Sequence, residues 1–78
     1  MTVTQYTWAD LELADRHIVE GRQRIARQEE ILSSLRMHGL PCSEAEKLLV
    51  VFNDTHAERQ KHRDAIAAAI AGESEPWN

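Results

Sequence analysis

Three residues of this sequence have side chains suited to binding a metal ion. His62 follows Glu58 by one helical turn, and a chain folded back near Leu40 brings His17 close to His62. Imidazole and carboxylate groups are the ligands of zinc and iron sites in helical bundles. The sequence lacks the E-x-x-H motif of di-iron bundles, however, and a half-buried histidine bonded to a carboxylate explains these residues more simply. We therefore predict no metal centre and no cofactor, and keep His17, Glu58 and His62 as the candidates should the chain be a metal-binding bundle.

A second group of residues is basic. Seven of the nine lysines and arginines fall between positions 16 and 28 or between 55 and 63, in company with only two acids, Glu20 and Glu58. Such a basic band is typical of surfaces that bind phosphate groups. Neighbouring opposite charges on the same helix also explain it as an ordinary solvated surface. RNA binding by a hairpin dimer is therefore the alternative function, and its candidate residues are Arg16, Arg22, Arg24, Arg27, Lys61 and Arg63.

Residues for catalysis are missing. The sequence has no glycine-rich phosphate loop, and its single cysteine, Cys42, has no neighbouring base that would make it a nucleophile. We expect no enzymatic activity. The net charge of −4 disfavours nonspecific binding to nucleic acid or to anionic membranes. Neither a membrane span nor a signal peptide is recognisable, which predicts a cytoplasmic protein.

The elements that must position these residues are two long helices. Thr7 and Asp10 have the spacing of a helix start, and Gly39, Leu40 and Pro41 have the pattern of a Schellman ending that stops the helix at His38. Between these ends, residues spaced three and four apart form a heptad seam, the stripe that faces a partner helix. The seam consists of Leu11, Ala14, Ile18, Gly21, Ile25, Gln28, Leu32 and Leu35.

The second helix begins directly after the turn. Ser43 and Glu46 form the S-x-x-E capping box, and Gly72 is expected to end the helix after Ala71. Because the connection is short, the two helices must lie antiparallel. We therefore predict an all-α fold, an antiparallel two-helix hairpin that resembles a coiled coil. Its parts are an N-terminal arm (1–6), a hairpin (7–72, with helices about 8–38 and 43–71 and a turn at 39–42) and a flexible tail (73–78).

Apolar residues near the turn point in every direction around the second helix, so a lone hairpin cannot cover them all. A chain of 78 residues without a disulfide is also close to the lower size limit for a sufficient core. We expect self-association, most simply a homodimer that forms a four-helix bundle, or else a higher homo-oligomer. The expected surface consists of Ile31, Met37, Leu48, Leu49, Val50, Val51 and Phe52.

A polar layer interrupts the apolar seam. Folding the chain back about Leu40 and Pro41 places Arg59 opposite Gly21, where a missing side chain leaves room for the arginine stem. Polar layers of this kind fix the register and oligomeric state of helical bundles. The expected layer consists of Gly21, Gln28, Thr55, Arg59 and His62.

These features favour a small cytosolic oligomerisation or protein-interaction module, with a second copy of the chain and another cytosolic protein as partners, and no contact with membranes. Four segments carry a resemblance: A-D-R-H-I-V-E-G at 14–21, R-I-A-R-Q at 24–28, S-E-A-E-K-L-L at 43–49 and H-R-D-A-I at 62–66. With these the chain resembles short bacterial helical-hairpin proteins, which implies a stand-alone cytoplasmic hairpin and no particular activity. In architecture alone it is similar to RNA-binding hairpins of the plasmid repressor-of-primer type, which dimerise into four-helix bundles.

Overall fold

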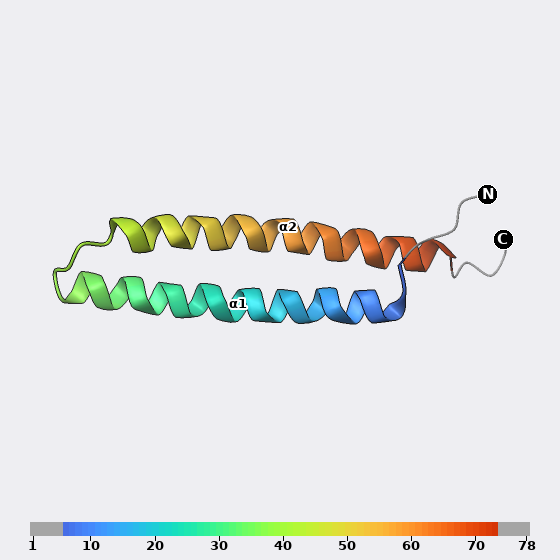
Figure 1. Cartoon of the computed structure of the whole chain (residues 1–78), viewed down its shortest axis with the longest axis horizontal. Coiled ribbons are helices and arrows are strands. Elements are labelled where there is room, and N and C mark those ends of the chain that lie inside the picture. The colour runs from blue at the N-terminus through green and yellow to red at the C-terminus, as the bar shows by residue number, and fades with distance from the viewer. Residues whose placement is uncertain (1–5, 74–78) are drawn as a thin grey trace.

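Two antiparallel helices joined by a short turn make up the fold (Figure 1). The computed structural model describes residues 6–73, with α1 spanning Trp8–Met37 and α2 spanning Ser43–Glu73. The all-helical hairpin is thus confirmed. Residues 1–5 of the predicted arm and 74–78 of the predicted tail lie outside the described residues. Neither helix, over the described residues, is long and apolar enough to cross a membrane. The cytoplasmic location stays a prediction.

The start of α1 is fixed by a reciprocal capping box. The Asp10 backbone N–H donates to Thr7 Oγ1 (3.2 Å), and the Thr7 backbone N–H donates to Asp10 Oδ2 (2.8 Å). The two bonds satisfy amides that have no partner within the helix. The helix start predicted at Thr7 is confirmed.

The end of α1 is a Schellman motif. Gly39 has a φ of 66°, its N–H donates to the Arg36 carbonyl (3.1 Å), and the Leu40 N–H donates to the Leu35 carbonyl (2.9 Å). Glycine suits this position because it adopts the left-handed conformation without a steric penalty from Cβ. The predicted ending is confirmed, and it reverses the chain within a few residues.

α2 begins at Ser43 as predicted, but its N-terminal cap and its last residue differ from the prediction. The Glu46 N–H donates to the Cys42 carbonyl (2.9 Å), so Cys42 caps the helix and Ser43 is its first residue. The Glu46 carboxylate accepts from Arg36 Nη2 (3.2 Å), and the capping box predicted for Ser43 and Glu46 is wrong. Gly72 does not end the helix, because its φ is not positive and α2 continues to Glu73.

The apolar core lies at the open end, where α1 begins and α2 ends. Ile66, Ile70 and Ala14 are buried against one another, with Leu11 packed against them. Ile18 and Leu32 are buried farther along the hairpin. On α2, side chains that are at least half-buried recur three and four residues apart and form its seam, which consists of Ala45, Leu49, Phe52, His56, Arg59, Arg63, Ile66 and Ile70.

Candidate interaction surface

The residues that flank the seam fall on two sides of the hairpin. Arg22 and Arg24 are two positions apart on α1, which separates their directions by about 200°. We call one side the ion-pair side and the other the histidine side. The ion-pair side is lined by Asp15, Val19, Arg22, Gln60, Arg63 and Asp64, and the histidine side by Leu13, His17, Arg24, Val51, Thr55 and His62. Ile31 and Leu48 extend the histidine side towards the turn, since each lies seven residues, or two helical turns, beyond Arg24 and Thr55.

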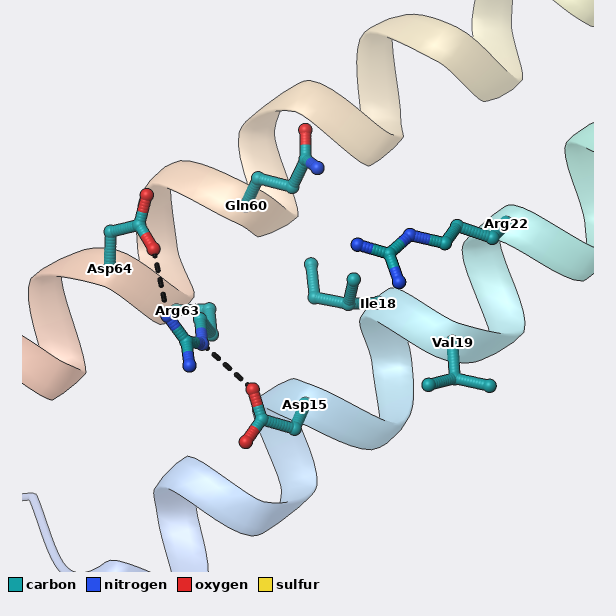
Figure 2. A pocket seen from close by; sticks show the side chains of 7 residues that line it. All are labelled: Asp15, Ile18, Val19, Arg22, Gln60, Arg63 and Asp64. Atoms are coloured by element: carbon teal, nitrogen blue, oxygen red, sulfur yellow. Dashed lines mark hydrogen bonds and ion pairs between the residues drawn. The ribbon is translucent and has the colours of Figure 1, made fainter.

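Charged groups of the two helices pair on the ion-pair side (Figure 2). Arg63 Nε donates to Asp15 Oδ1 across the interface (2.7 Å), and its Nη1 donates to Asp64 Oδ1 (3.1 Å). These two bonds, the one to Asp15 first, raise the pKa of Arg63 above its ordinary value. Arg36 and Glu46 form a second interhelical pair at 3.2 Å. Arg22 points into a pocket of about 600 Å³ beside the first pair.

The histidine side carries more exposed apolar residues than the ion-pair side, where Val19 is 50 % exposed. Leu13, Ile31, Leu48 and Val51 expose 46, 42, 43 and 54 % of their surface. Within residues 6–73 no ion pair joins the two helices on this side. Its polar contacts are weak ones, such as the guanidinium of Arg24 over the Phe52 ring at 5.8 Å. The two sides therefore differ in the surface that a partner could contact: paired charges on the ion-pair side and exposed apolar side chains on the histidine side.

The seven residues predicted for self-association are not on one surface. Ile31, Leu48 and Val51 are exposed on the histidine side, and the half-buried Phe52 lines a pocket there. Leu49 belongs to the seam and faces α1. Val50 and Met37 are exposed, but their helical positions direct them away from the histidine side. The apolar residues near the turn do point in several directions, as the sequence predicted, and only those on the histidine side form a patch.

The predicted polar layer is correct on α1 and needs correction on α2. A Cβ added to the buried Gly21 would lie 2.6 Å from His56 Nδ1, so His56, not Arg59, is the residue opposite Gly21. Arg59 lies beside it, on the wall of the same pocket of about 190 Å³. Thr55 and His62 are exposed and are not part of a buried layer.

The error in register comes from the turn. Reflection about Leu40 and Pro41 treats the turn as a symmetrical hinge, but α1 extends beyond the start of α2 and the turn runs back alongside it (Figure 1). This displaces α2 by about one helical turn relative to the reflected position. His56 fits the three-and-four spacing of the α2 seam. The apolar run at 48–52 that precedes it fits several seams equally well, so the sequence does not indicate which one faces α1.

Gln28 is the second polar group within the interface. Its side chain is 6 % exposed, and its Nε2 donates to the Ala45 backbone carbonyl on α2 (3.1 Å). A buried amide without such a bond would lose solvation without compensation. The partner could not be read from the sequence, because a backbone carbonyl leaves no signal there. His56 Nδ1, in contrast, is buried without a hydrogen-bond partner among the described residues.

The basic residues predicted as one anion-binding face are divided between the sides. Arg24 lies on the histidine side, whereas Arg22 and Arg63 lie on the ion-pair side, where Arg63 is bonded to two carboxylates. The remaining members, Arg16, Arg27 and Lys61, are exposed. A continuous phosphate-binding surface is not formed by this distribution.

The three metal candidates are not brought together. His17 and His62 line one pocket with Tyr6, whose ring meets that of His62 edge-on at 6.0 Å. Glu58 is exposed and is not among the residues lining that pocket. In the part of the chain that the structure describes, no three side chains of His, Cys, Asp or Glu are grouped to hold a metal ion.

Comparison with known proteins identifies no relative of this chain. No protein-family model matches the chain, and no curated protein and no solved structure matches it either.

Proposed function

We propose that the chain is a small self-association module, in which two hairpins pack through their histidine sides. The observation that carries the proposal is the contrast between the two sides. Interhelical ion pairs occupy the ion-pair side, whereas Leu13, Ile31, Leu48 and Val51 stand exposed along the histidine side. Apolar side chains that follow one side of a helix pair are typical of an interface with another helical element.

The shortage of buried apolar groups supports the same proposal. Only five hydrophobic residues of the described chain are buried. None of the described side chains is less than 2 % exposed. Burial of apolar surface is the main favourable contribution to folding, and a small hairpin gains it most simply from a second copy. Four helices would then share one core.

The test is the dependence of mass and thermal stability on concentration. Light scattering and sedimentation of the wild-type chain should give a dimer at micromolar concentration, and the melting temperature should rise with concentration. A monomer with a cooperative transition independent of concentration would remove the proposal.

Two neighbouring valines locate the surface. Val50 and Val51 are exposed by 59 and 54 %, but only Val51 lies on the histidine side. Val51→Glu should dissociate the assembly, and Val50→Glu, the matched control, should leave the mass unchanged. Dissociation by Val50→Glu alone would place the interface on the other side.

A further inference from the structure

Four exposed residues on the histidine side of α1 have a symmetrical order. Leu13, Glu20, Arg24 and Ile31 are in this order apolar, acidic, basic and apolar. Glu20 and Arg27 lie on the same side of the helix as Leu13, because they follow it by two and four helical turns. Glu20 and Arg24 each lie two positions from Arg22, and Leu13 and Ile31 each lie nine positions from it. Arg22 is also next to the middle of α1, which spans Trp8–Met37.

A two-fold axis that crosses α1 at right angles near Arg22 makes this order complementary to itself. Rotation about it lays α1 of one chain antiparallel on α1 of another, so each residue meets the one at equal distance on the opposite side of the axis. Glu20 then meets Arg24 of the second copy, and Leu13 meets Ile31 of the second copy, each contact occurring twice. His17 meets Arg27 of the second copy, a contact that supplies no opposite charge. The apolar contacts lie about 13 Å from the axis on either side.

The side chains involved are available for these contacts. Leu13 and Ile31 are 46 and 42 % exposed, and both Glu20 and Arg24 are exposed. Neither charged group forms an ion pair within the described residues. Leu48, across the hairpin from Ile31, enlarges the apolar patch at the turn end.

We infer that the histidine side docks on the same side of a second copy in the antiparallel orientation, with Glu20 of each chain against Arg24 of the other. This arrangement rests on the proposed function and adds to it the orientation and the specifying pair. A parallel arrangement of the two hairpins would place Arg24 against like charge, which charge complementarity disfavours.

Charge reversal tests the pair. Arg24→Glu and Glu20→Arg should each raise the dissociation constant of the homodimer roughly tenfold, because each creates two repulsive contacts. Repulsion within one chain cannot be relieved by mixing, whereas repulsion between chains can. An equimolar mixture of the two variants should therefore form heterodimers with close to wild-type affinity, detected by native mass spectrometry. Arg22→Glu, a reversal on the ion-pair side, is the matched control and should change the dissociation constant little.

Cysteine cross-linking tests the orientation independently. In a Cys42→Ser background, Leu13→Cys and Ile31→Cys chains should form a disulfide-linked heterodimer when mixed and oxidised, and little homodimer when oxidised alone. Homodimer cross-links at Leu13→Cys would show parallel docking and overturn the inference. A wild-type dimer whose affinity is unaffected by either charge reversal would overturn the pair but leave the proposed function standing, whereas a monomeric wild type would remove both.

Discussion

The open end and the turn half of the hairpin use their apolar residues in opposite ways. At the open end Ala14, Ile66 and Ile70 are buried against one another. In the turn half Leu32 is the buried apolar residue and Gln28 the buried polar one, whereas Ile31 and Leu48 are exposed. The turn half has more large apolar residues than the open end, yet it buries a smaller share of them.

This difference shows that hydrophobic content does not locate the core of a two-helix protein. One helix can cover only one stripe of its neighbour, so the apolar residues that lie off the seam remain outside however many there are. At the open end the residues of the apolar core lie on the seam, whereas Leu13 and Val19 lie beside it and are exposed. In the turn half the seam is apolar apart from Gln28, yet Ile31 and Leu48 lie beside it and stay exposed.

The largest effect should come from the core of the open end. Ile66 is 2 % exposed, and Ile66→Ala should cost about 2–5 kcal/mol of unfolding free energy through lost burial and the cavity left behind. Urea unfolding followed by circular dichroism measures it. Leu48→Ala in the turn half is the control. At concentrations too low for association it should cost little, and an equal loss in both variants would abolish the contrast between the two regions.

Gly21 should give the next largest effect. Gly21→Leu raises helix propensity by roughly 1 kcal/mol but drives a side chain into the ring of His56, and we expect crowding to dominate with a net loss of about 1–3 kcal/mol. Gly72→Ala is the matched control, because among the described residues no side chain lies within 4 Å of its added Cβ, and it should not destabilise. A higher melting temperature for Gly21→Leu would contradict the packing of His56 on Gly21.

A smaller effect is expected from the buried polar contact of the turn half. Gln28→Met keeps the length of the side chain but removes the bond from Nε2 to the Ala45 carbonyl, at a cost of about 1 kcal/mol. Amide hydrogen exchange should also quicken in the first turns of α2. Unchanged exchange there would show that the bond does not hold the register.

The smallest effect should come from the exposed ion pair. Asp15→Asn removes the principal partner of Arg63, and the loss of stability should be slight and should vanish in high salt, since both side chains are accessible to water. The hydrogen bonds to Asp15 and Asp64 raise the pKa of Arg63, so its charge contributes to stability at every pH below its unfolded pKa, and that contribution is lost only as the pH rises through the folded pKa. A loss that persists in high salt would indicate a buried interaction.

Local patterns in the sequence predicted the helices and most of their ends. The Thr7 capping box and the Schellman ending at Gly39 depend only on near neighbours, and both were readable. The S-x-x-E pattern at Ser43 failed because Glu46 has a competing partner, Arg36, which only the folded hairpin brings near. Contacts between the two helices could not be predicted from the sequence for the same reason.

The register shows the limit most clearly. It depends on how much length the turn uses in crossing between the helices, and residues 38–42 carry no periodicity from which that length can be read. An error of one helical turn exchanges Arg59 for His56 at Gly21 while leaving both helices correct. A surface that spans both helices can be predicted only when the register is known, because the register decides which residues of α2 lie beside which residues of α1.

The position of the core at the open end also governs the order of folding events. The Arg36–Glu46 contact near the turn closes a segment of 10 residues, whereas the Asp15–Arg63 contact near the core closes one of 48. The longer closure costs about 1.4 kcal/mol more chain entropy. A hairpin that zips from its turn avoids this long closure, and it passes Leu32, Gln28 and Gly21 before it reaches the apolar contacts at Ile66. We therefore expect the contacts nearest the turn to form first, and the apolar cluster of Ala14, Ile66 and Ile70 to form after them.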